Sequence, residues 1–154
     1  MRLGWLEAPK IIQDKIILSA TLSSGGGLNQ YTSAIMGTAL KNEILSSYFT
    51  DMILDLKRKM ELMCESLDKY AKPYVKYRKP TGGYFVWIEL PSNCDAEAFT
   101  KYCEKHKVSM RPGRRFSPNG NFKNFIRLCF AFLAEEEIEK GIREIGTALN
   151  EFCG

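Results

Sequence analysis

Apolar residues in the first third of the chain recur at helical spacing. Pro9 fits the first turn of a helix, where its missing N–H costs nothing. The apolar positions that follow are Ile11, Ile12, Ile16 and Leu18. Three glycines at 25–27 predict that this helix has ended, because glycine is costly in a helix interior. Asn29 is the predicted N-cap of a second helix that runs toward Leu45.

A longer apolar stripe predicts a third helix, capped by Thr50 or Asp51. Its apolar positions alternate at intervals of three and four residues: Ile53, Leu56, Met60, Met63, Leu67 and Tyr70. This spacing is typical of a helix with one apolar face. A short coiled coil is the other interpretation, but we favour a helix packed on a sheet or another helix.

From Pro73 onward the period changes to that of strands interrupted by turns. The expected strands are 74–78, 84–90, 107–110 and 124–132, and the expected helices start near Asp95 and Ala134. The segment 84–90 is apolar on both faces, which predicts a central strand covered on two sides. The order indicates an α+β (α/β) fold, with helices on one face of a small, mostly antiparallel sheet.

Composition narrows the function classes. A net charge of +4, without a basic helix or an aromatic platform, does not favour nucleic acid. No segment approaches the roughly 20 apolar residues of a membrane span, and the N-terminus lacks the apolar core of a signal peptide. Five cysteines without C-x-x-C spacing, together with a single histidine, indicate reduced thiols and no metal site. We therefore expect a cytoplasmic protein with neither nucleic-acid nor membrane partners.

One arginine stands out among the candidate functional residues. In the strand 124–132, alternation places Arg127 on the same face as Phe125, Cys129 and Ala131. A guanidinium in such surroundings is partly buried and needs a counter-charge. Arginine is suited to binding a carboxylate through two parallel hydrogen bonds. The alternative is an edge-strand arginine that lies in water or pairs with a surface glutamate.

Three other signals are weaker. The glycines at 25–27 have the composition of a phosphate-binding loop but not its spacing, so a flexible loop is the better interpretation. The cluster Arg111, Arg114 and Arg115 is interpreted as a solvated or anion-lined loop. His106 lies at a predicted helix end, where a surface position is expected.

Five motifs then occur in the order found in one enzyme family. They are Arg2-Leu3-Gly4-Trp5, Pro80-Thr81-Gly82-Gly83-Tyr84-Phe85-Val86-Trp87, Arg111-Pro112-Gly113 with Phe116, Arg127-Leu128-Cys129-Phe130-Ala131, and Glu136 through Gly141-Ile142. Together they resemble the C-terminal part of class I/II (fold type I) pyridoxal-phosphate-dependent aminotransferases. The segment 26–32 is similar to the subgroup around aminoadipate and aromatic aminotransferases.

The resemblance implies a domain organisation. Residues 1–48 would be the helical end of the large domain. Residues 49–154 would be the long connecting helix and the small C-terminal, substrate-binding domain. The complete enzyme would be a homodimer that moves an amino group between an amino acid and a 2-oxo acid.

The resemblance also assigns site residues. Arg127 would bind the substrate carboxylate, and Arg2 would contact the phosphate of pyridoxal 5′-phosphate. The Schiff-base lysine of the family is expected upstream of Met1, as though the chain began at an internal methionine. No catalytic residue is therefore expected within these residues, and the chain alone should be inactive and should not bind the cofactor.

Two other functions are compatible with this half of the sequence. One is a non-catalytic regulatory or interaction domain with an aminotransferase-like fold, although nothing here resembles a helix-turn-helix. The other is a lyase or synthase that uses the same cofactor and fold.

Overall fold

The chain divides into two compact units, Met1–Asp51 and Met52–Gly154. The computed structural model describes residues 3–23 and 29–153, so Arg2 and the glycines at 25–27 lie outside the described residues. The assignment of 1–48 to a large domain and 49–154 to a small one stays a prediction.

The first unit is helical, as the apolar spacing predicts. It contains α1 (Lys10–Ile17), α2 (Ala20–Ser23), α3 (Gln30–Lys41) and the start of α4 (Leu45–Tyr70). Neither α1 nor α3 has a buried residue, and the side chain of Trp5 is 86% exposed. The apolar stripes of these helices are therefore largely uncovered.

The predicted start of the long helix was wrong. α4 begins at Leu45, and Thr50 lies inside it with its hydroxyl donating to the carbonyl oxygen of Ser46 at 3.1 Å. A threonine that bonds back to the preceding turn satisfies its hydroxyl without ending the helix. Residues 45–49 therefore form the first turn of the same helix that carries the predicted apolar stripe.

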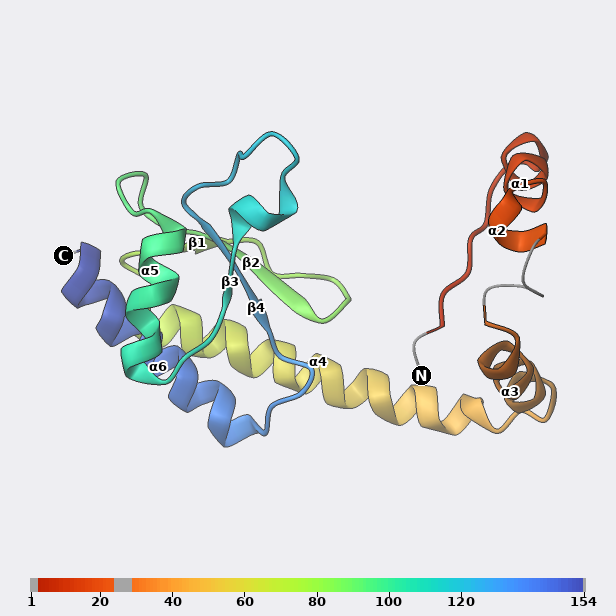
Figure 1. The fold of residues 1–154 in the computed structure, drawn as a ribbon. Helices are drawn as coiled ribbons and strands as arrows, with labels where there is room; N and C mark the ends of the chain where they lie inside the picture. Colours follow the sequence, from red (N-terminus) through yellow and green to blue (C-terminus); the bar gives the residue numbers. More distant parts are fainter. Residues whose placement is uncertain (1–2, 24–28, 154) are drawn as a thin grey trace. The chain divides into compact units, whose positions relative to one another are not determined.

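The second unit is built on a four-stranded antiparallel sheet (Figure 1). Its strands are β1 (Lys76–Tyr77), β2 (Phe85–Glu89), β3 (Arg111–Pro112) and β4 (Phe125–Cys129). The spatial order is β1-β2-β4-β3, so β2 and β4 are the two inner strands. The predicted antiparallel sheet and the central position of β2 are confirmed.

Three helices bury one face of this sheet: the later part of α4, α5 (Ala96–Cys103) and α6 (Glu135–Cys153). Asp95 caps α5 as predicted, accepting a hydrogen bond from the amide of Ala98 at 2.8 Å. The predicted stripe of α6 is buried; it consists of Ile138, Ile142, Ile145 and Leu149. It packs into one core with apolar residues of β2 and β4. The α+β architecture is confirmed.

Other details of the strand prediction were wrong. The third strand lies at Arg111–Pro112 and not at 107–110, because Lys107 takes a left-handed backbone (φ 58°) that ends a 3-10 turn. β4 stops at Cys129, and the side chain of Phe132 is 92% exposed. β2 is fully covered on one face only, since Val86 and Ile88 are buried whereas Phe85 is exposed. The uncovered face carries the candidate site.

No helix in the described part of the chain has the length and apolar character needed to cross a membrane.

Candidate functional site

The face of the sheet that points away from the helices carries the predicted arginine. Arg127 on β4 lies directly opposite Trp87 on β2 and Arg111 on β3. Directly opposite residues on antiparallel strands share a face. This row of two guanidinium groups and one indole therefore crosses three strands on the uncovered side.

The 3-10 turn Gly113–Phe116 and the residues after it fold over this face. A Cβ at Gly113 would lie 2.7 Å from the Cβ of Phe125 and 2.8 Å from the carbonyl oxygen of Phe122. Only glycine permits this approach, because a side chain there would push the turn off β4. Gly113 thereby holds Phe116 close to the sheet.

Aromatic rings from this turn and from the sheet surround Trp87. The indole contacts Phe116 and Phe122 edge to face at 5.7 and 5.5 Å, and it stacks on Phe125 at 5.6 Å. Such arrangements are the favoured geometries of aromatic pairs. The cluster gives the uncovered face a rigid apolar floor beside Arg127.

The guanidinium of Arg127 is held between two phenyl rings. Its Cζ lies 3.8 Å from the ring centroid of Phe85 and 4.3 Å from that of Phe116. A guanidinium donates its hydrogen bonds in its own plane, so a cation–π contact with a ring leaves those donors available. The edge of Arg127 is thus the part best placed to bind a planar anion.

Arg127 has no acidic partner among residues 3–23 and 29–153. Arg111, directly opposite on β3, carries the same charge, and like charges directly opposite repel each other. The expected edge position is wrong, because β4 is an inner strand, and no described carboxylate pairs with Arg127. The arrangement favours an anion that neutralises both residues.

Of the other predicted candidates, Arg111 joins this site, whereas Arg114 and His106 do not. Arg114, in the same turn, pairs with Glu97 at 3.4 Å on the surface. His106 is not a free surface residue, since its two ring nitrogens each lie 3.4 Å from a carboxylate, of Glu144 and of Glu151. It therefore links the 3-10 turn after α5 to α6.

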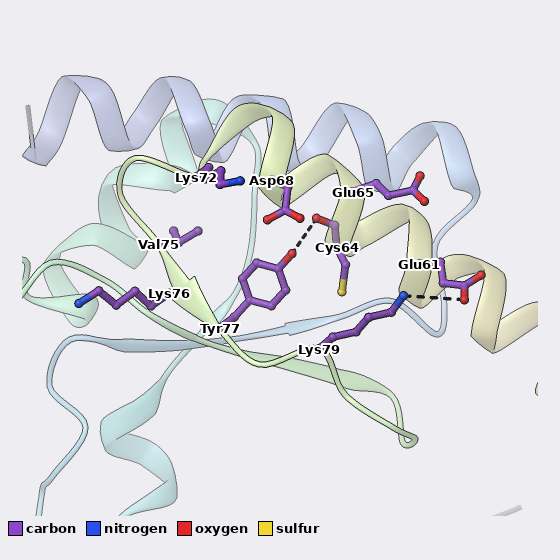
Figure 2. A pocket seen from close by; sticks show the side chains of 9 residues that line it. All are labelled: Glu61, Cys64, Glu65, Asp68, Lys72, Val75, Lys76, Tyr77 and Lys79. Atoms are coloured by element: carbon purple, nitrogen blue, oxygen red, sulfur yellow. Dashed lines mark hydrogen bonds and ion pairs between the residues drawn. The ribbon is translucent and has the colours of Figure 1, made fainter.

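A cavity of about 490 Å³ between α4 and β1 offers a second candidate (Figure 2). Its lining carries three carboxylates of α4 and three lysines: Glu61, Glu65 and Asp68, and Lys72, Lys76 and Lys79. Figure 2 shows Lys72 beside Asp68 and Lys79 beside Glu61. Desolvation by burial raises the pKa of the Cys64 thiol at its floor, which disfavours the nucleophilic thiolate. The Tyr77 hydroxyl is already bonded, at 2.9 Å, to the carbonyl oxygen of Cys64. Balanced charges and a protonated thiol make this cavity a poor catalytic site.

Sequence reasoning found Arg127 but missed the two rings that hold it. Phe85 lies two residues before the opposite residue of β2, and only the antiparallel register brings it onto the guanidinium. Phe116 belongs to one of the five motifs, but the motif assigns it no role. The alternation of side chains along β2 and β4 could have indicated Phe85, because it places a set of residues on the same face of the sheet: Phe85, Trp87, Phe125 and Arg127.

Comparisons with known proteins agree on one family. A profile described as "Aminotransferase class I and II" matches residues 1–145. The 2-aminoadipate transaminase of Thermus thermophilus is 34% identical over 119 residues, 75% of this chain and 30% of that protein. The aromatic-amino-acid aminotransferase 1 of Thermococcus litoralis is 27% identical over 151 residues, 97% of this chain and 36% of that protein.

The fold has a solved counterpart. The multiple substrate aminotransferase of Thermococcus profundus superposes with a TM-score of 0.84 at 28% identity, covering 94% of this chain and 36% of that one. The chain is also 28% identical over 149 residues to the HTH-type transcriptional regulator NorG of Staphylococcus aureus, covering 96% of this chain and 33% of the regulator. It thus spans about a third of the length of the curated relatives it matches.

Proposed function

Because this chain belongs to the class I and II aminotransferase family, we propose that it is the C-terminal part of a pyridoxal-phosphate-dependent transaminase. The complete protein would move an amino group between an amino acid and a 2-oxo acid. The names of the relatives support a 2-aminoadipate or an aromatic substrate.

Arg127 would bind the α-carboxylate shared by the amino acid and the oxo acid. The observation that carries this proposal is the guanidinium held between Phe85 and Phe116 without an acidic partner in the described residues. A carboxylate approaching in the plane of the guanidinium would accept two parallel hydrogen bonds. A carboxylate bound in this way has a fixed orientation beside the aromatic cluster around Trp87.

The cofactor would be held mainly outside the described residues. Pyridoxal 5′-phosphate, when bound, supplies the electron sink for reactions at the substrate α-carbon. By resemblance, Arg2 would contact the cofactor phosphate, and Arg2 lies outside the described residues. The Schiff-base lysine would lie before Met1 by the same resemblance. Uncovered apolar residues on α1 and α3 support a larger domain packed against them, as in a full-length homodimer. Five free thiols support a cytoplasmic location.

Phe116 is expected to position Arg127 and not to take part in chemistry. Replacing it with leucine keeps an apolar side chain but removes the ring face over the guanidinium. In the complete enzyme we expect KM for the amino acid to rise by roughly 2- to 30-fold, from about 0.5–2 kcal/mol of lost cation–π contact. The rate constant kcat should change less, and steady-state kinetics would measure both.

Two variants make this test specific. Phe116→Tyr keeps the ring and should behave like the wild type. Phe122→Leu removes a ring that contacts Trp87 but is not placed over Arg127, so its KM should stay within about twofold. Equal losses in Phe116→Leu and Phe122→Leu would show that the cluster acts only through stability.

The proposed function is tested by comparing these 154 residues with the longest reading frame that contains them. We expect the longer polypeptide to transaminate 2-aminoadipate or an aromatic amino acid with a 2-oxo acid. Borohydride should fix the cofactor onto one lysine upstream of Arg2. The 154 residues alone should show neither activity nor stoichiometric labelling of a lysine. Transamination by the short chain would contradict the proposal, and so would an inactive longer polypeptide.

The similarity to NorG supports a second candidate, a regulator that carries this fold behind a DNA-binding segment. The sequence of the longest reading frame distinguishes the transaminase from the regulator. A helix-turn-helix upstream of the aminotransferase-like part, with binding of an operator sequence in a mobility-shift assay, would favour the regulator. A lyase or synthase would release a product from one amino acid without needing a 2-oxo acid.

A further inference from the structure

Two cysteines far apart in the sequence meet in the second unit. The Sγ of Cys153 lies 2.8 Å from the Sγ of Cys94, across 59 positions of the chain. Their spacing gave no sign of a pair, and the sequence predicted only separate reduced thiols. The contact arises from the fold, because Cys94 precedes α5 whereas Cys153 ends the described part of α6.

Both thiols are held by anchored backbone. The amide of Cys94 donates to the carbonyl oxygen of Pro91 at 2.9 Å, and the next residue, Asp95, caps α5. The side chain of Cys94 is 3% exposed. Cys153 is half-buried, and the ring of Phe152 beside it packs on Phe99 at 5.6 Å. The two sulfur atoms therefore stay neighbours as long as α6 is docked.

We propose that Cys94 and Cys153 form a reversible disulfide that ties the end of α6 to the start of α5. The oxidant would be a low-molecular-weight disulfide such as oxidised glutathione. The more exposed Cys153 thiolate attacks one sulfur of the oxidant and releases one glutathione. Cys94 then loses its proton, attacks the Sγ of Cys153 and releases the second. Two protein thiols and one oxidised glutathione give one protein disulfide and two glutathione molecules.

Neighbouring thiols compete poorly for Cys153. Among the described residues, the sulfur contact of Cys153 is with Cys94, whereas Cys103 is fully buried and desolvation raises its pKa. Burial also raises the pKa of Cys94 above its ordinary value. Because the thiolate is the attacking form, closure of the disulfide should be slow near neutral pH and should accelerate as the pH rises.

Peptide mapping tests the proposal directly on the 154-residue chain. Trypsin places each of the five cysteines on a different peptide, so any linkage identifies its two residues. The folded protein would be treated with oxidised glutathione, alkylated and digested without reductant. We expect one linked pair, of the peptides that carry Cys94 and Cys153, lost on adding dithiothreitol. The oxidised chain should melt roughly 5–10 °C higher than the reduced chain.

Three variants and a denatured sample serve as controls. Cys94→Ser should stop at a mixed disulfide of glutathione with Cys153, and Cys153→Ser should leave Cys94 unlinked. Cys103→Ala keeps the proposed pair and should link as the wild type does. A linkage of Cys103 to Cys153 would overturn the proposal. So would a mixture of disulfides in the folded chain that matches the mixture formed when the denatured chain is oxidised. Five free thiols after oxidation of the folded wild type would do the same, whatever the variants show.

Discussion

In the complete enzyme, replacing Arg127 with alanine is expected to lower kcat/KM for the amino acid substrate by roughly 30- to 5000-fold. The range corresponds to about 2–5 kcal/mol, the usual effect of truncating one partner of a buried, hydrogen-bonded charge pair. The effect should be large because the rings of Phe85 and Phe116 lie close to the guanidinium and limit its contact with water. Arg127→Lys should recover only part of the loss, since an ammonium cannot form the two parallel bonds.

Substrate choice makes the Arg127 experiment specific. An amine without a carboxylate has nothing for the guanidinium to bind, so wild type and Arg127→Ala should process it at similar low rates. Arg114→Ala is the matched control, because this arginine lies in the neighbouring turn but pairs with Glu97 on the surface. Its kcat/KM should stay within about twofold of the wild type. A carboxylate substrate that Arg127→Ala handles as well as the wild type does would show that the arginine is structural.

Local and periodic features of this fold could be predicted from the sequence. The stripe of α6 and the Asp95 cap depend on residues within a few positions of one another, and both are confirmed. The face on which Arg127 lies follows from simple alternation along β4. Each of these features is encoded by neighbours in sequence.

Features that depend on distant segments could not be predicted. The place of β3 is set by pairing with β4 and by the left-handed Lys107, not by its own apolar pattern. The ring of Phe116 reaches Arg127 because Gly113 lets the turn approach β4. The contact of Cys94 with Cys153 needs α5 and α6 to be docked first. Such contacts follow from tertiary packing between distant segments, which the local pattern of residues does not specify.

The largest stability effect is expected at Gly146, where α6 crosses the end of α4. A Cβ at this position would clash with the carbonyl oxygen of Tyr70 and lie 3.0 Å from its carbonyl carbon. These are backbone atoms of the last residue of α4, so no side-chain rotation relieves the clash. The crossing is held nearby by the Tyr70 hydroxyl, which donates to Glu139 at 2.7 Å. Gly146→Ala should therefore lower the free energy of unfolding by about 2–3 kcal/mol, despite alanine's higher helix propensity.

Gly141 provides the matched control one and a half turns earlier on the same helix. A Cβ there meets no atom within 4 Å, so Gly141→Ala should gain helix propensity without a clash and raise stability by about 0.5–1 kcal/mol. Urea unfolding of the chain and both variants, followed by far-UV circular dichroism, measures the two changes with opposite expected signs. The substitution is chemically the same at both positions. If both variants changed the free energy of unfolding in the same direction, helix propensity would dominate, and the packing of α6 on α4 would adjust to the added Cβ at little cost. Opposite signs would show that the close contact of Gly146 with Tyr70 is needed for α6 to pack on α4. The core beneath the face that carries Arg127 depends on the same packing.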